Sequence, residues 1–151
     1  MAEHKIIVEI EIEAPPEKVF DAWTDPTQLA AWWGDDSFYR TEEWTCDVRP
    51  GGRWHCRGKG AGNGMEGPFE VGGEYTLVER PSRLGFTWAP DWEQGRVTDV
   101  LVELTPTASG TKLRLTHTGF ATVESREGHH EGWKRVLAWL TRHVASPRAP
   151  R

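Results

Sequence analysis

The chain has 151 residues, a formal net charge of −5 at pH 7 and a mean hydropathy of −0.61. A hydrophobic content of 37% with nine tryptophans excludes a disordered chain and indicates one globular domain. The acidic charge argues against nucleic acid and membranes as partners, and no apolar run reaches the ~18 residues of a membrane helix. Because the N-terminus also lacks the pattern of a secretory signal, we expect a cytoplasmic protein.

The N-terminal segment predicts one strand followed by two short helices. Residues 5–13 alternate between aliphatic side chains and glutamate, which is typical of a half-buried antiparallel strand. Prolines 15 and 16 interrupt the strand, and residues 17–23 form a short helix. A second helix is expected over 26–33, with Asp25 as its N-cap and Gly34 directly after its end.

From residue 38 to residue 118 the pattern is one of strands and turns. The expected strands are residues 38–48, 53–57, 66–79, 83–88, 97–105 and 111–118. The glycine-rich stretch 58–64 predicts a hairpin loop, and the pair Gly72-Gly73 predicts a kink or bulge within its strand.

Residues 125–144 predict a long amphipathic helix. Its apolar face carries Trp133, Val136, Leu137, Leu140 and Val144 at helical spacing. The segment 145–151 is expected to be a disordered tail, so the single domain spans residues 1–144. This order of elements predicts an α+β fold in which a curved antiparallel sheet of about six to seven strands wraps the C-terminal helix.

Five stretches carry a resemblance to a known family: APPEKVFDAWTDPTQLAAWWG, DVRPGGRW, GEY with RPSRLGFTW, GTKLRLTHTGF and HHEGWKRVLAWL. In this order and spacing they resemble bacterial proteins similar to the C-terminal domain of the activator of the heat-shock-protein-90 ATPase. That family lies in the START-like, birch-pollen-allergen-like helix-grip superfamily (SRPBCC). The resemblance covers about residues 5 to 144 and implies an internal cavity between the sheet and the last helix.

Two features depart from the family pattern. Asp35 stands where the family often has proline after the WWG motif, and the loop 58–64 is richer in glycine than expected. Both lie near the expected cavity entrance, so the identity of a ligand does not carry over from the family.

The adjacent tryptophans 32 and 33 raise the question of which one faces a ligand. Neighbouring helical positions point about 100° apart, so the two rings cannot share a direction. Trp33 lies four residues after Leu29, which predicts that Trp33 packs into the core. Trp32 is then expected nearer the cavity rim, although both could simply be core residues.

A ligand-binding cavity is the leading interpretation of the aromatic interior. The candidate binding residues are Trp32, Trp54, Tyr75, Phe86, Trp88, Trp92, His117, His129, Trp133 and Leu137. Most inward-facing residues of such a sheet belong to the core, and the alternative for each of these is structural packing. Collectively they form an aromatic surface that suits a flat apolar ligand.

Two histidines are the candidates for catalysis. The phase of the last strand predicts that His117 points inward, where it is either a hydrogen-bonded structural histidine or an acid–base group. His129 shares a helix face with Trp133 and is placed near the cavity mouth. An enzyme would use these two imidazoles as a pair, assisted by Tyr75.

No motif predicts a metal or a cofactor. The sequence contains neither closely spaced metal ligands nor a phosphate-binding loop, and we expect no cofactor. Cys46 and Cys56 are expected to be reduced thiols, with a disulfide between neighbouring strands as the alternative.

Three functions follow as hypotheses. The first is binding of a small hydrophobic or aromatic molecule. The second is a cyclase, dehydratase or hydrolase acting on a polyketide-like or aromatic substrate. The third, implied by the family name alone, is a co-chaperone of the heat-shock protein 90. A homodimer is also plausible, because sheets of this kind expose an edge strand.

Overall fold

The computed structural model describes residues 5–35, 38–60, 67–92 and 96–145. The helices are α1 (Pro16–Thr24), α2 (Pro26–Trp32) and α3 (Val123–Ala145). The strands are β1 (Lys5–Ile12), β2 (Gly34–Asp35), β3 (Tyr39–Cys46), β4 (Arg53–Gly60), β5 (Pro68–Glu79), β6 (Arg83–Pro90), β7 (Thr98–Pro106) and β8 (Thr111–Thr118). The expected tail beyond Ala145 and the loop residues 61–64 lie outside the described residues.

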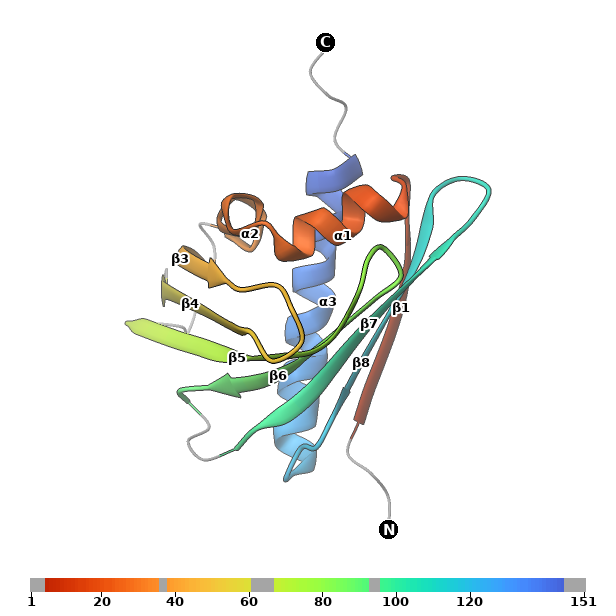
Figure 1. The fold of residues 1–151 in the computed structure, drawn as a ribbon. Coiled ribbons are helices and arrows are strands. Elements are labelled where there is room, and N and C mark those ends of the chain that lie inside the picture. Colours follow the sequence, from red (N-terminus) through yellow and green to blue (C-terminus); the bar gives the residue numbers. More distant parts are fainter. Residues whose placement is uncertain (1–4, 36–37, 61–66, 93–95, 146–151) are drawn as a thin grey trace.

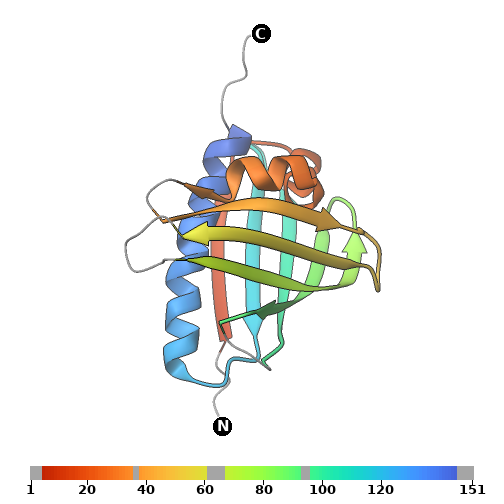
Figure 2. The same ribbon diagram turned by 90° about the vertical axis from the view of Figure 1, so that its left-hand side faces the viewer.

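The strands form one antiparallel sheet in the order β1-β8-β7-β6-β5-β4-β3-β2. The sheet curls into a half-barrel around α3: β1 and β8 run alongside the helix, whereas β3, β4 and β5 cross it (Figures 1 and 2). The predicted α+β helix-grip architecture is thereby confirmed. One strand more than expected is present, because Gly34 and Asp35 pair with Arg40 and Tyr39 as the short strand β2.

The two short helices close one end of the half-barrel (Figures 1 and 2). The predicted N-cap of α2 is confirmed, since the Asp25 carboxylate accepts a hydrogen bond of 3.0 Å from the Thr27 backbone N–H. However, α2 ends at Trp32, one residue earlier than predicted. Trp33 has extended backbone angles (φ −89°, ψ 94°), and Gly34 has a φ of +127°, a conformation that favours glycine.

Strand β5 is irregular, but not at the predicted position. Its register against β6 shifts between Tyr75 and Leu77, two residues beyond the expected kink. Beyond this shift Leu77 is only half-buried, and Val78 packs against the core.

The core lies between the concave face of the sheet and α3. Trp133, Leu137 and Leu140 of α3 are buried there, facing sheet residues such as Leu113 and Leu115. The outer face of the sheet carries charges, for example the ion pair between Arg114 and Glu9 on neighbouring strands. Within the described part of the chain, the helices are too short or too polar to cross a membrane.

Candidate ligand-binding pocket

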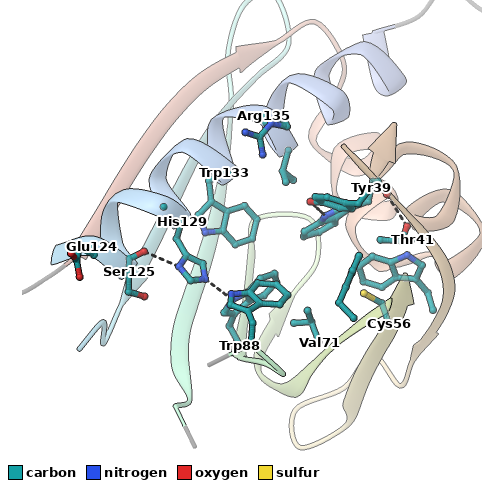
Figure 3. A pocket seen from close by; sticks show the side chains of 17 residues that line it. Tyr39, Thr41, Cys56, Val71, Trp88, Glu124, Ser125, His129, Trp133 and Arg135 are labelled. Atoms are coloured by element: carbon teal, nitrogen blue, oxygen red, sulfur yellow. Dashed lines mark hydrogen bonds between the residues drawn. The ribbon is translucent and has the colours of Figure 1, made fainter. Parts of the chain in front are cut away.

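A pocket of about 380 Å³ lies between α3 and the crossing strands (Figure 3). It is lined by Trp33, Tyr39, Thr41, Trp44, Cys56, Phe69, Val71, Trp88, Trp92, Glu124, Ser125, Gly128, His129, Gly132, Trp133, Arg135 and Val136. Strands β3 to β6 supply one wall and the N-terminal half of α3 supplies the other. The volume is at the lower end of the ~300–1,000 Å³ typical of small-molecule sites.

Tryptophan rings form the centre of the pocket wall. Trp33 and Trp88 are nearly parallel, with ring centroids 6.2 Å apart and an interplanar angle of 17°. Trp133 lies 5.3 Å from Trp88, and Trp44 lies 5.2 Å from Trp33, in both cases between centroids. Ring pairs at these separations attract one another, so the wall is held in shape by its own members.

Hydrogen bonds occupy most of the indole N–H groups of this wall. Trp33 donates to the Tyr39 hydroxyl at 3.1 Å, Trp88 donates to Nε2 of His129 at 3.2 Å, and Trp133 donates to Nδ1 of His117 at 2.9 Å. Because the N–H groups of these three rings already donate to protein acceptors, the rings present apolar surface to the pocket. Trp44 differs, because its buried Nε1 has no hydrogen-bond partner among the described residues.

His117 is fully buried, so its predicted inward orientation is confirmed. Because Nδ1 accepts from Trp133, the ring proton of the neutral imidazole lies on Nε2, which is 2.6 Å from the Thr98 hydroxyl. That hydroxyl in turn donates to the Trp88 carbonyl at 3.3 Å. Burial, with a smaller contribution from His129, lowers the pKa of His117 to about 3. His117 is therefore neutral at physiological pH, and it is not a lining residue of the pocket.

His129 does line the pocket, and both of its ring nitrogens are also engaged. Nε2 accepts from Trp88, so Nδ1 carries the proton and donates to the Ser125 carbonyl at 2.9 Å (Figure 3). Trp92 stacks on the imidazole with 6.5 Å between centroids. The rings of His117 and His129 are 5.4 Å apart, yet neither presents a free nitrogen to the pocket in this arrangement. The acid–base pair required by the enzyme hypothesis is therefore not formed.

Two further titratable groups of the pocket wall, Tyr39 and Cys56, are neutral at pH 7. Burial raises the pKa of Tyr39 to about 12 and that of the Cys56 thiol to about 12. Both cysteines are free. The described residues contain no group of three or more side chains arranged to hold a metal ion.

The predicted binding residues divide into three groups. Trp88, Trp92, His129 and Trp133 line the pocket. Trp54, Tyr75 and Phe86 line a separate void of about 20 Å³, which is too small for an organic ligand. Trp32, His117 and Leu137 belong to the buried core and line neither space.

Trp33 is buried in the core, as predicted, but it also takes the place at the pocket that was expected of Trp32. Trp33 lines the pocket, whereas Trp32 is buried and donates from Nε1 to the Ala22 carbonyl at 2.9 Å. The prediction assumed that Trp33 is helical. Because α2 ends at Trp32, Trp33 has an extended backbone, and its ring packs against Trp44 of β3 with 5.2 Å between centroids.

Several lining residues were missed from the sequence. Thr41 and Trp44 lie on opposite phases of β3, and a register shift between Thr41 and Glu43 brings both to the concave face. Gly128 and Gly132 gave a usable signal, since two glycines four residues apart are unfavourable in a helix unless something must approach that face. Arg135 of α3 was also missed.

A curled antiparallel sheet closed on a long C-terminal helix, with a pocket between them, places the chain in the helix-grip class of proteins. The family model for "Activator of Hsp90 ATPase homolog 1-like protein" matches residues 13–145, and the chain belongs to this family. No curated protein matches the sequence.

Solved structures show the same fold. The AHSA1-like protein of Aeromonas hydrophila is 28% identical, with a TM-score of 0.75 over 93% of this chain and 91% of that one. The AHSA1 protein of Silicibacter pomeroyi is 27% identical, with a TM-score of 0.79 over 93% and 97%. A protein of Chromobacterium violaceum, at 24% identity and a TM-score of 0.83 over 95% and 99%, is similar in fold.

Proposed function

We propose that this protein binds a small, flat hydrophobic or aromatic molecule in the pocket between α3 and strands β3 to β6. The observation that carries the proposal is the wall of Trp33, Trp88 and Trp133, whose N–H groups are engaged by protein partners. Such a wall offers apolar ring surface for contact and few competing polar groups. Burial of apolar surface against it contributes roughly 25 cal/mol per Å², and ring–ring geometry adds to this.

The helix wall also supports a binding role. At Gly128 and Gly132 an added Cβ would meet no atom within 4 Å, so no packing constraint of the protein requires glycine there. Each glycine costs a helix roughly 1 kcal/mol relative to alanine. A ligand lying against this face of α3 explains why the less stable residue is present at both positions.

Binding without turnover is the form of the proposal that the histidines favour. A general base must present an unoccupied nitrogen to its substrate. In His129 the pocket-facing ring is engaged by Trp88 and Ser125, and His117 is separated from the pocket. The partner in this proposal is therefore a small apolar molecule that is held and released unchanged.

Titration with N-phenyl-1-naphthylamine tests the proposal. This neutral dye becomes fluorescent in apolar surroundings, and binding should also quench tryptophan emission. The variant Gly132→Leu places a branched side chain in the open space of the pocket and should weaken binding at least about tenfold, or about 1.4 kcal/mol. The matched control is Ala138→Leu, at an exposed position of the same helix that does not line the pocket.

Saturable binding by the wild type and by Ala138→Leu, with loss in Gly132→Leu, is the expected result. Equal binding by all three proteins would place the dye elsewhere and would contradict the proposal. Absence of binding to the wild type by this dye and by a panel of neutral aromatic compounds would also contradict it.

A further inference from the structure

The pocket is apolar along its centre but carries opposite charges at its two ends. Glu124 and Arg135 both line it, and they lie eleven residues apart on α3. At about 1.5 Å per residue this separation is about 16 Å along the helix axis. Figure 3 shows Glu124 beside Ser125 at one end and Arg135 on the side of Tyr39. At that distance across an open pocket the two side chains do not neutralise one another.

Arg135 has no acidic partner within the described part of the chain. Arg57, Arg80 and Arg114 each form an ion pair with a carboxylate, and the neighbouring Lys134 pairs with Glu131. The Arg135 guanidinium instead lies over the Phe38 ring, 4.1 Å from its centroid. A stacked guanidinium is weakly hydrated and held in one orientation, and its edge N–H groups remain available.

The Tyr39 hydroxyl is a second donor at this end. The Tyr39 hydroxyl accepts from Trp33, and its own proton remains to be donated. Burial raises the pKa of Tyr39 to about 12, so the group keeps that proton at neutral pH. Among the described residues, the carboxylate in this region is that of Asp35, which does not line the pocket and accepts from Nε1 of Trp139 at 3.1 Å.

We infer that the ligand is amphipathic, with a carboxylate bound at the Arg135 end of the pocket and a flat apolar body against the tryptophan wall. This inference rests on the proposed function and specifies the chemical class of the ligand. The planar Arg135 guanidinium, which has no acidic partner among the described residues, matches the two oxygens of a carboxylate, and the Tyr39 hydroxyl on the same side of the pocket can donate to the same group. The bound ligand thus lies along α3, with its uncharged end toward Glu124.

A pair of nearly isosteric probes tests the inference. 2-Naphthoate and 2-naphthamide share the same ring system and differ in the charge of one planar substituent. Dissociation constants are measured by quenching of tryptophan fluorescence at pH 7. The wild type should bind 2-naphthoate about tenfold more tightly than 2-naphthamide, as a charge-assisted hydrogen bond in a partly wet site would give. This comparison needs no variant and is independent of any folding defect.

The variant Arg135→Gln removes the cation and should abolish the preference by weakening 2-naphthoate alone. Arg142→Gln is the matched control, because it removes the same charge from an exposed position of α3 outside the pocket. Its preference for 2-naphthoate should equal that of the wild type. Thermal melting of each variant verifies that the fold is retained.

The outcomes separate the two proposals. Equal affinities of the wild type for both probes would overturn the carboxylate assignment and leave the apolar pocket standing. Equal loss of preference in Arg135→Gln and Arg142→Gln would also overturn it, since the effect would then come from net charge. If neither probe nor any neutral aromatic compound bound the wild type, both proposals would fall together.

Discussion

The indole N–H of Trp133 donates a 2.9 Å hydrogen bond to Nδ1 of His117 in the interior, joining α3 to β8. The bond places the ring proton on Nε2, toward Thr98, and both ring nitrogens of the buried imidazole are satisfied only while the ring is neutral. The contact therefore makes the attachment of the helix to the sheet sensitive to acid.

The first prediction concerns this sensitivity. The folded-state pKa of His117 is about 3, below the ordinary value of 6.5. Between these two pH values His117 is protonated in the unfolded chain but neutral in the folded chain. The free energy of unfolding therefore falls as the pH falls. The slope attributable to one such group approaches about 1.4 kcal/mol per pH unit in the middle of this range, and the effect is absent above pH 7.

Urea unfolding of the wild type and of His117→Gln at pH 7.0, 6.0 and 5.0 measures this slope. Glutamine retains one donor and one acceptor but does not titrate, so the variant should show a shallower pH dependence. His143→Gln is the comparison variant: burial also lowers the pKa of this less buried histidine, so its removal should reduce the slope by less than His117→Gln does. If the free energy of unfolding of His117→Gln depended on pH as steeply as that of the wild type, the low folded-state pKa of His117 would be contradicted.

The second prediction separates the two adjacent tryptophans. Trp33→Phe alters the pocket wall and should weaken N-phenyl-1-naphthylamine binding about tenfold. Trp32→Phe leaves the Ala22 carbonyl without its donor and should lower the free energy of unfolding by about 1–3 kcal/mol with little change in affinity. Dye titration and urea unfolding of both variants provide the comparison. A larger affinity loss in Trp32→Phe would mean that the ligand lies elsewhere.

The third prediction concerns the destabilising effect of Gly132 on α3. Gly132→Ala should raise the free energy of unfolding by up to about 1 kcal/mol, because the helix gains alanine and the new Cβ meets open space. The same methyl group narrows the pocket, and dye affinity should fall. Ala138→Gly, on the exposed face, should lower stability by about 1 kcal/mol and leave the affinity unchanged. Unaltered binding by Gly132→Ala would show that the ligand does not touch this wall.

The fourth prediction uses two neighbouring glycines of β5. A Cβ on Gly73 would lie 2.0 Å from the Thr87 carbonyl oxygen and 2.7 Å from Trp54 Nε1, two atoms that themselves form a 3.2 Å hydrogen bond. Gly73→Ala should therefore destabilise the fold by about 2–4 kcal/mol. At Gly72 the closest atom is 3.1 Å away, and Gly72→Ala should cost less than about 1 kcal/mol. Thermal and urea unfolding test the difference, and equal costs would contradict the close approach.

Much of the fold was predictable because it depends on local pattern. Alternation over residues 5–13 identified β1, and the Asp25-Pro26 pair located the start of α2. The apolar stripe through Trp133 and Leu140 identified α3, and the phase of β8 placed His117 inside. Each of these signals involves residues a few positions apart, where helix and strand geometry leave little freedom.

The candidate site was predicted less completely, since its walls come from segments far apart in the chain. The one-residue difference in the end of α2 decided that Trp33, not Trp32, lines the pocket. The register shift in β3 brought Thr41 and Trp44 to the same face. A prediction from sequence assumes that side chains alternate between the two faces along the whole strand. At a bulge the alternation shifts by one residue, so residues beyond the bulge are assigned to the wrong face.

The sequence by itself determined the order and type of the elements and the aromatic character of the interior, because periodicity and composition act locally, and its ordered motifs indicated the family. Only the tertiary structure decided which aromatic rings enclose the pocket, which nitrogens of His117 and His129 are engaged, and that Arg135 lies at one end of that pocket without an acidic partner among the described residues. These features depend on how far the sheet curls around α3, and the curl is set jointly by strands distant in sequence.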